Sequence, residues 1–183
     1  MNNLAQKISV IHTLGPSGTN CEIAAHEWFA RQNLQGKVCL HPTLETAAAK
    51  IEDEDSAALM GCVVYPQLHT LVFSNLKRLS LIDCFVFPTH NMVLASRNGK
   101  VPKSISTHPA PQELARSRQA ELRLVNSNSQ AAIDCADGIT DACITTLRAA
   151  KANQLQILED FGPVPMGYTI HVVKNNNERK NNF

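Results

Sequence analysis

The chain has 183 residues, a formal net charge of +1 and a hydrophobic fraction of 44%, which is typical of a globular protein with one domain or two small lobes. Basic and acidic residues are mixed along most of the chain, so there is no basic stripe for nucleic acid or for an anionic membrane surface. No apolar run has the length of about 20 residues that a membrane span needs, and the N-terminal MNNLAQKISVIH lacks a secretory signal. We therefore expect a cytoplasmic protein without nucleic-acid or membrane partners.

Cysteine and histidine residues are numerous but scattered. The six cysteines form no CxxC pair, and the seven histidines show no HExxH spacing. This scatter favours reduced thiols in the core over a disulfide framework, and we expect no metal site.

Apolar runs alternate with helical patterns in the first half of the chain, as in an α/β protein. In the first predicted helix, Cys21, Ala24, Ala25, Trp28 and Phe29 fall on one face. The pattern predicts strands at 7–14, 37–40 and 56–65, helices at 19–33, 43–54 and within 67–78, and a long extended segment at 79–96.

The second half repeats this alternation. It predicts strands at 104–107, 122–126, 141–145, 155–160 and 166–173, with helices at 109–120, at 128–136 and up to about 152. Two crossovers, near 86–92 and 161–166, then divide the chain into lobe 1 (1–87 and 165–176) and lobe 2 (88–164), followed by a disordered tail (177–183). Two crossovers between lobes predict a hinged cleft, where small ligands tend to bind.

The turn GPSGTNCE, residues 15–22, leads from a strand into the first helix. Gly15 and Gly18 tolerate unusual backbone angles, and Thr19 and Glu22 have the spacing of a capping box. The capping box accounts for Thr19 and Glu22, but two glycines around Ser17 also leave backbone N–H groups for an anion. The spacing is neither GxGxxG nor a P-loop, so we do not expect a nucleotide.

Three further turns place hydroxyl and amide groups where a helix is predicted to begin. Pro109 and Pro111 put a helix start near His108, with Thr107 as its cap, although His108 fits a surface position equally well. Ser127 and Gln130 have capping-box spacing next to Asn126, Asn128 and Ser129, and either Thr145 or Thr146 caps the next helix. Each turn alone fits ordinary capping, whereas the four together predict a ligand with more than one carboxylate.

Four motifs in chain order resemble a known family. They are TLGPSGT (13–19), THPAP (107–111), LVNSNSQAA (124–132) and PMGY (165–168). They resemble the catalytic domain of prephenate dehydratases over about residues 8–173, and more closely the prephenate decarboxylase branch of the bacilysin pathway. The resemblance implies an α/β, two-lobed fold of the periplasmic-binding-protein type (type II) with a ligand cleft between the lobes. It also implies a homodimer, and the chain stops where the ACT regulatory domain of dehydratases would begin.

Two segments depart from the dehydratase pattern. VVYPQLHT (63–70) stands where dehydratases carry Glu-Asn-Ser, and VPMGYTIH (164–171) stands where they carry Thr-Arg-Phe. The threonine of that triplet is taken to assist loss of the ring hydroxyl, so its replacement favours decarboxylation without dehydration.

The resemblance therefore implies non-aromatising decarboxylation of prephenate, with the ring hydroxyl retained, on the way to a modified amino acid or an antibiotic. No cofactor is implied, because the ring diene takes up the electrons. Two alternatives stay open: a prephenate dehydratase giving phenylpyruvate, and a non-catalytic module that binds small acids. The proton donor is His108, Tyr168 or Glu22, with a preference for His108. The residues expected to bind substrate are Ser17, Gly18, Thr19, Asn20, Thr107, His108, Asn126, Ser127, Asn128, Ser129, Thr145 and Met166.

Overall fold

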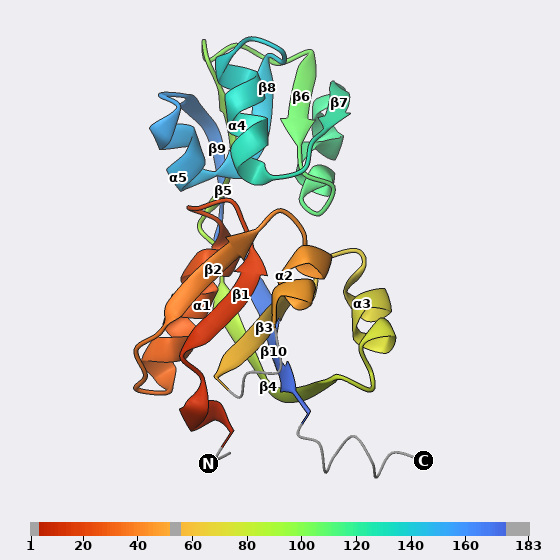
Figure 1. The fold of residues 1–183 in the computed structure, drawn as a ribbon. Coiled ribbons are helices and arrows are strands. Elements are labelled where there is room, and N and C mark those ends of the chain that lie inside the picture. Colours follow the sequence, from red (N-terminus) through yellow and green to blue (C-terminus); the bar gives the residue numbers. More distant parts are fainter. Residues whose placement is uncertain (1–3, 52–55, 175–183) are drawn as a thin grey trace. The chain divides into compact units, whose positions relative to one another are not determined.

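The computed structural model describes residues 4–51 and 56–174 and divides the chain into two compact units. Unit 1 comprises the chain up to Phe87 together with the segment from Met166 onward, and unit 2 runs from Pro88 to Pro165 (Figure 1). The predicted tail at 177–183 and the end of the predicted helix at 43–54 lie outside the described residues.

Unit 1 is built on a five-stranded sheet in the order β2-β1-β3-β10-β4. The strands β1, β2 and β3 are parallel, and β10 runs antiparallel to β3 with Tyr168 opposite Cys62. Its strands are β1 (Val10–Leu14), β2 (Lys37–His41), β3 (Ala57–Cys62), β4 (Leu79–Pro88) and β10 (Pro165–Val173). Its helices are α1 (Asn20–Arg31), α2 (Leu44–Lys50) and α3 (Leu68–Ser74), preceded by a short 3-10 helix at Ala5–Lys7.

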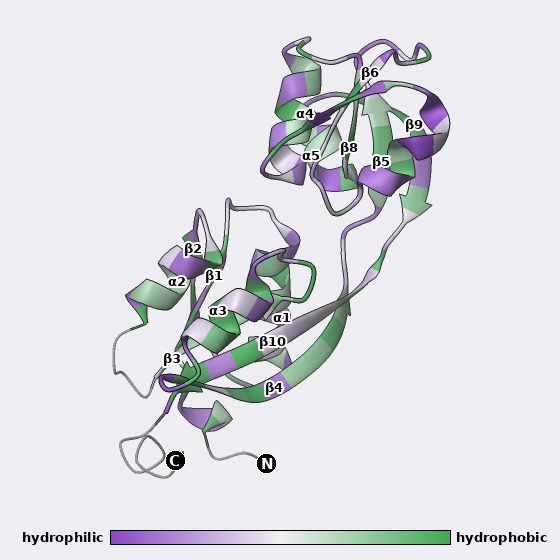
Figure 2. Ribbon diagram, turned by 90° about the vertical axis from the view of Figure 1, so that its right-hand side faces the viewer, coloured by the Kyte–Doolittle hydropathy of each residue, from purple (hydrophilic) through white to green (hydrophobic). Residues whose placement is uncertain are grey.

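Each face of this sheet buries its own apolar cluster. The helix α1 presents the predicted stripe to one face, where Trp28 is fully buried and its indole N–H donates to Asp83 at 2.7 Å. The helices α2 and α3 contribute Leu44 and Leu71 to the cluster that packs against β3 and β4. Figure 2 shows a long hydrophobic stretch on β4, whereas β10 has short hydrophobic stretches separated by polar ones.

Unit 2 is built on a second five-stranded sheet, in the order β7-β6-β8-β5-β9. The strands β7, β6 and β8 are parallel, while β5 is antiparallel to both β8 and β9. Its strands are β5 (Met92–Ser96), β6 (Ser104–Thr107), β7 (Glu121–Leu124), β8 (Ala142–Thr146) and β9 (Gln156–Gly162). Its helices are α4 (Asn128–Ala136), α5 (Leu147–Ala152) and a 3-10 helix, η2 (Gln112–Arg118).

One predicted helix differs in kind from the structure. The segment predicted as an α-helix at 109–120 is the 3-10 helix η2, which begins at Gln112 and ends before Gln119 in a left-handed conformation. Thr107 and His108 therefore do not lie at the start of an α-helix, since proline at 109 and 111 disfavours helical backbone angles at the preceding residues, His108 and Ala110. The extended segment predicted at 79–96 does cross from unit 1 to unit 2, and it does so as two strands, β4 and β5.

A polar network inside unit 2 ties α4 to the sheet. The carboxylate of Asp134, which is 3% exposed, accepts hydrogen bonds from Arg123 at 2.9 Å and from Gln130 at 2.8 Å. Ser106 contributes a longer contact of 3.5 Å and itself accepts from Thr140 at 3.0 Å. Although burial acts to raise it, the pKa of Asp134 is lowered, because Gln130 and Arg123 donate to the charged form.

We expect Asp134→Ala to lower the free energy of unfolding by about 2–3 kcal/mol, because it removes charge-assisted hydrogen bonds at a buried position. A folded-state pKa below the ordinary value gives stability that is present at pH 7 and lost as the pH falls below about 4. Urea denaturation at pH 7 and pH 3 should therefore show a difference between wild type and Asp134→Ala that shrinks in acid.

The control is Asp137→Ala, at the exposed position that follows α4, with an expected change within about 0.5 kcal/mol. Equal losses in the two variants would contradict a structural role specific to the Asp134 carboxylate.

Candidate active site

The predicted site residues of unit 2 gather at one edge of its sheet. Parallel strands end at a common edge, and the segments that follow β6, β7 and β8 all begin there. Thr107 ends β6, Ser127 caps α4 after β7, and Thr145 lies at the end of β8. Residues that are up to 38 positions apart in the sequence are thereby brought to one edge of a single unit.

Hydrogen bonds fix the beginning of α4 at this edge. The hydroxyl of Thr145 donates to the carbonyl oxygen of Asn128 at 2.6 Å, and the Ser127 hydroxyl accepts from the backbone N–H of Gln130 at 3.0 Å. The N–H of Val125 donates to the carbonyl of Thr107 at 3.0 Å. The capping role of Ser127 is thus confirmed, while the Gln130 side chain donates to Asp134 and does not complete a capping box.

The polar groups at this edge differ in what they offer a ligand. The hydroxyl of Thr107 is buried and donates to the carbonyl of His108 at 3.0 Å, and the hydroxyl of Thr145 is also buried and engaged. Asn126 is exposed, and Ser129 is half-buried in the first turn of α4. No hydrogen-bond partner is found among the described residues for the buried Oδ1 of Asn128.

His108 lies half-buried just beyond β6. Its Nδ1 accepts from the backbone N–H of Ala110 at 3.2 Å, so a neutral ring carries its proton on Nε2. Burial lowers the pKa of this imidazole, which keeps it neutral at pH 7.

The glycine turn of unit 1 is filled by its own helix. The carboxylate of Glu22 accepts from the Ser17 hydroxyl at 3.0 Å and from the Gly18 backbone N–H at 2.5 Å. Thr19 makes no capping bond and donates to the carbonyl of Leu14 at 3.3 Å, so the predicted Thr19–Glu22 capping box is wrong. Asn20 is the first residue of α1 and is half-buried. A carboxylate does occupy this turn, but it is the protein's own.

The two glycines of this turn serve different purposes. Gly18 has a φ of +85°, a left-handed conformation that suits glycine. Gly15 is needed for space instead, because a Cβ there would lie 3.1 Å from the Cβ of Leu40.

Tyr168 and Met166 lie on β10, and both pack against the cluster under α1. Tyr168 is 1% exposed, its ring stacks on Phe85 at 5.5 Å, and burial raises the pKa of its hydroxyl. Met166 is half-buried against the same cluster.

The thiols of Cys21 and Cys62 lie close to this cluster. The pKa of Cys21 is raised, first by its interaction with the Cys62 thiol and second by burial. Four of the six cysteines are buried, as expected for thiols of the core, whereas Cys39 is half-buried and Cys84 is exposed.

Sequence reasoning missed a histidine pair in unit 1. Nδ1 of His12 lies 2.9 Å from Nε2 of His41, with the rings stacked at 5.0 Å. The pKa of His41 is lowered, mainly by burial and secondly by the positive charge of Lys50. The two residues are 29 positions apart, so no local motif could have indicated the pair, which arises from the pairing of β1 with β2. Within the described part of the chain, no third ligand completes a metal site around them.

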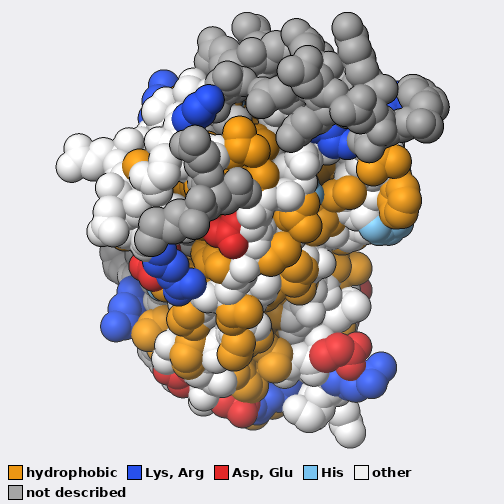
Figure 3. Space-filling model, turned by 90° about the horizontal axis from the view of Figure 1, so that it is seen from below, with side chains coloured by type: hydrophobic (Ala, Val, Ile, Leu, Met, Phe, Trp, Pro, Cys, Tyr) orange, Lys and Arg blue, Asp and Glu red, His pale blue; other side chains and the backbone are white. Residues whose placement is uncertain are grey.

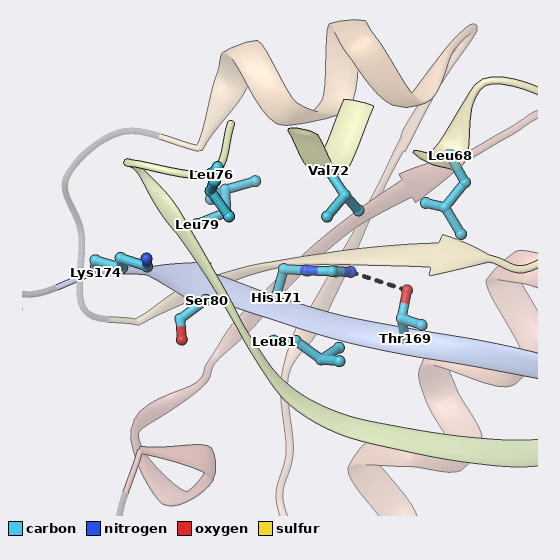
Figure 4. A pocket seen from close by; sticks show the side chains of 9 residues that line it. All are labelled: Leu68, Val72, Leu76, Leu79, Ser80, Leu81, Thr169, His171 and Lys174. Carbon is cyan, nitrogen blue, oxygen red and sulfur yellow. Dashed lines mark hydrogen bonds between the residues drawn. The ribbon is translucent and has the colours of Figure 1, made fainter. Parts of the chain in front are cut away.

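A groove of about 360 Å³ in unit 1 lies apart from the predicted site residues. It runs between α3, β4 and β10, and Figure 4 shows its mainly aliphatic side chains with the His171–Thr169 hydrogen bond of 3.0 Å. Burial lowers the pKa of His171, so its ring is neutral and offers little attraction to an anion. Apart from Lys174 at one end, the groove is lined by apolar and neutral side chains, which suit an apolar ligand better than a dicarboxylate.

Comparisons with known proteins support the resemblance drawn from the motifs. The chain is 26% identical to a prephenate decarboxylase from Bacillus subtilis over 177 residues, covering 90% of this chain and 86% of that protein. It is also 26% identical to a prephenate decarboxylase from Planktothrix agardhii over 180 residues, covering 90% and 88%. No family model matches the chain. The placement beside prephenate decarboxylases is thereby confirmed.

Solved structures confirm the predicted fold class. The structure of prephenate dehydratase from Arthrobacter aurescens in complex with L-Phe matches with a TM-score of 0.68 and 19% identity. The match covers 91% of this chain, which spans 61% of that longer one. The VFT2 domain of BvgS from Bordetella pertussis matches with a TM-score of 0.57 and 15% identity, covering 97% of this chain and 88% of that chain. The fold is therefore the α/β, two-unit type expected, whereas a ligand cleft between the units stays a prediction.

We expect Glu22→Gln to lower the free energy of unfolding by about 1 kcal/mol, because a neutral amide accepts more weakly from Ser17 and Gly18 and loses the favourable field of α1. Urea denaturation followed by circular dichroism checks this. Glu113→Gln, in an exposed pair with Arg116, is the control and should change little. An unchanged Glu22→Gln variant would show that the turn does not depend on this carboxylate.

His108 predicts a pH dependence of stability. Its folded-state pKa is lowered, so its contribution is present above about pH 6.5 and is lost as the pH falls through the folded-state value. Relative to His108→Gln, the wild type should lose free energy of unfolding between pH 7.5 and pH 5.5. Denaturant titrations at both pH values test this, with His26→Gln at an exposed position of α1 as the control. A difference that stays constant with pH would contradict burial of the neutral ring.

Proposed function

We propose that this protein is a cofactor-independent prephenate decarboxylase that keeps the ring hydroxyl of its substrate. The observation that carries the proposal is the alignment of 90% of the chain with proteins named prephenate decarboxylase. The absence of the Thr-Arg-Phe triplet from residues 164–171 supports retention of the hydroxyl.

The reaction needs no outside electron donor or acceptor. The bond between the ring and its carboxylate breaks, CO2 leaves, and the electron pair moves through the ring diene to a carbon that takes up one proton. The product is a dihydro-4-hydroxyphenylpyruvate. Catalysis then rests on binding, on shielding the departing carboxylate from water, and on delivery of one proton.

In unit 2, the beginning of α4 is proposed to bind the substrate carboxylate that is not lost as CO2. The N–H groups of the first turn and the hydroxyl of Ser129 are the donors, and the positive end of the helix favours an anion. Thr107 and Thr145 do not contact the substrate in this proposal. Their buried hydroxyls hold the backbone of this edge in place.

His108 is the proposed proton donor, acting through Nε2. The neutral ring accepts from the Ala110 N–H through Nδ1, so it can deliver a proton to carbon only after it has become imidazolium, the form that the carboxylates of the bound substrate favour. Glu22 and Tyr168 receive structural roles in this proposal, since Glu22 binds its own turn and Tyr168 packs in the core.

The test is to incubate the protein with prephenate and to follow CO2 and the ultraviolet absorbance of phenylpyruvate together. We expect CO2 without phenylpyruvate. Ser129→Ala should reduce kcat/KM about tenfold through loss of one hydrogen bond to a charged group, while Ser117→Ala, at an exposed position of η2, should not. Phenylpyruvate formation would identify a dehydratase, and binding without CO2 would identify a non-catalytic module.

A further inference from the structure

We propose that the groove beside α3 in unit 1 is an interface for a second copy of this chain, which inserts its own Phe73 there. The inference concerns unit 1 alone and does not depend on the proposed reaction. It starts from an apolar side chain at the surface and an apolar groove that lies next to it.

The groove has apolar walls and room for an aromatic ring. The side chains of Leu68 and Val72 come from α3, and those of Leu81, Thr169 and His171 come from β4 and β10 (Figure 4). A cavity of about 150 Å³ is large enough to hold benzene. A groove of about 360 Å³ therefore accepts a phenyl ring.

Phe73 lies at the rim of this groove. Its carbonyl accepts from the N–H of Leu76 at 3.3 Å, so the two residues are one turn apart and lie side by side. Leu76 lines the groove. The side chain of Phe73 is 74% exposed, more than any other large hydrophobic side chain in the described part of unit 1. A projecting phenyl ring and a groove that can hold one thus belong to the same patch.

The apolar part of this patch carries no formal charge. The segments 68–76 and 79–82 contain no lysine, arginine, aspartate or glutamate. Arg78 lies between them, but it donates to the carbonyl oxygens of Ala48 and Ile51, so its charge serves the end of α2. Depletion of charge at the centre is the compositional mark of a protein interface.

A second copy of the chain is the partner that suits this patch. Because the patch has both the ring and the groove, two copies related by a twofold axis each insert Phe73 into the other. The charges of Lys77 and Lys174 lie at the margin, as in interfaces with a polar rim. The segment 175–183 contains one apolar residue, Phe183, and its composition suits the groove less well.

The experiment measures the dissociation constant of the dimer by sedimentation equilibrium over a wide range of protein concentration. Phe73→Asp removes the ring, and Val72→Phe fills the groove from its own wall. We expect each to raise the dissociation constant about tenfold or more. Val101→Asp, at a position of unit 2 that is 89% exposed, is the control and should change it less than about twofold.

Fluorine NMR of protein labelled with fluorophenylalanine gives a second readout. The resonance that Phe73→Leu removes should shift as the concentration rises, because its ring passes from water into the groove. A resonance that stays unchanged while dimers form would overturn the inference.

Melting temperatures show whether the variants are folded, and Phe73→Asp decides the matter if Val72→Phe is not. A wild type that is monomeric at every concentration would overturn the inference, and this is the outcome expected if a different protein or the segment 175–183 fills the groove. A dimer that Phe73→Asp leaves intact forms through another surface and would overturn it too. Release of CO2 from prephenate is scored separately, so failure of the proposed activity is not confused with failure of the interface.

Discussion

The hydrogen bond from the Thr145 hydroxyl to the carbonyl of Asn128 is the contact on which the candidate site of unit 2 depends. It joins the end of β8 to the first turn of α4, while Val125 ties the approach to that helix to the end of β6. From the other side, Asp134 holds α4 through Arg123 and Gln130. A helix restrained at its beginning and along its body presents its first N–H groups in a fixed direction, as anion binding requires.

Unit 1 handles the same type of edge differently. The helix α1 begins beside a turn whose hydrogen-bond donors are used by Glu22, so this edge has little positive field left for a ligand. The exposed side chains that follow β3 at this edge, Val63 and Val64, are apolar.

Charged side chains of both signs are interspersed with hydrophobic ones on the face seen in Figure 3, in line with the net charge of +1. The structure describes no helix that is long and apolar enough to cross a membrane. Recognition of an anion is therefore local to particular turns and does not come from the overall field.

Local patterns predicted most of the fold, because the apolar periodicity of α1 and the buried run of β3 each point to one type of element. They failed at η2, because Pro109 and Pro111 are compatible with the start of either an α-helix or a 3-10 helix. They also failed at Thr19, whose hydroxyl donates to the backbone carbonyl of Leu14 and does not cap α1. The part of the site that could not be predicted arises from contacts between distant segments. The His12–His41 pair exists only once β1 and β2 are paired, so no spacing in the sequence encodes it.

The place of β10 in the sheet of unit 1 has a consequence for the order in which the chain can fold. This strand lies between β3 and β4, yet it follows the whole of unit 2 in the sequence. During synthesis from the N-terminus, every strand of unit 2 leaves the ribosome before β10 does, so unit 2 can complete its sheet while β4 still lacks its neighbour. The half of the molecule that begins first is thus the half that finishes last.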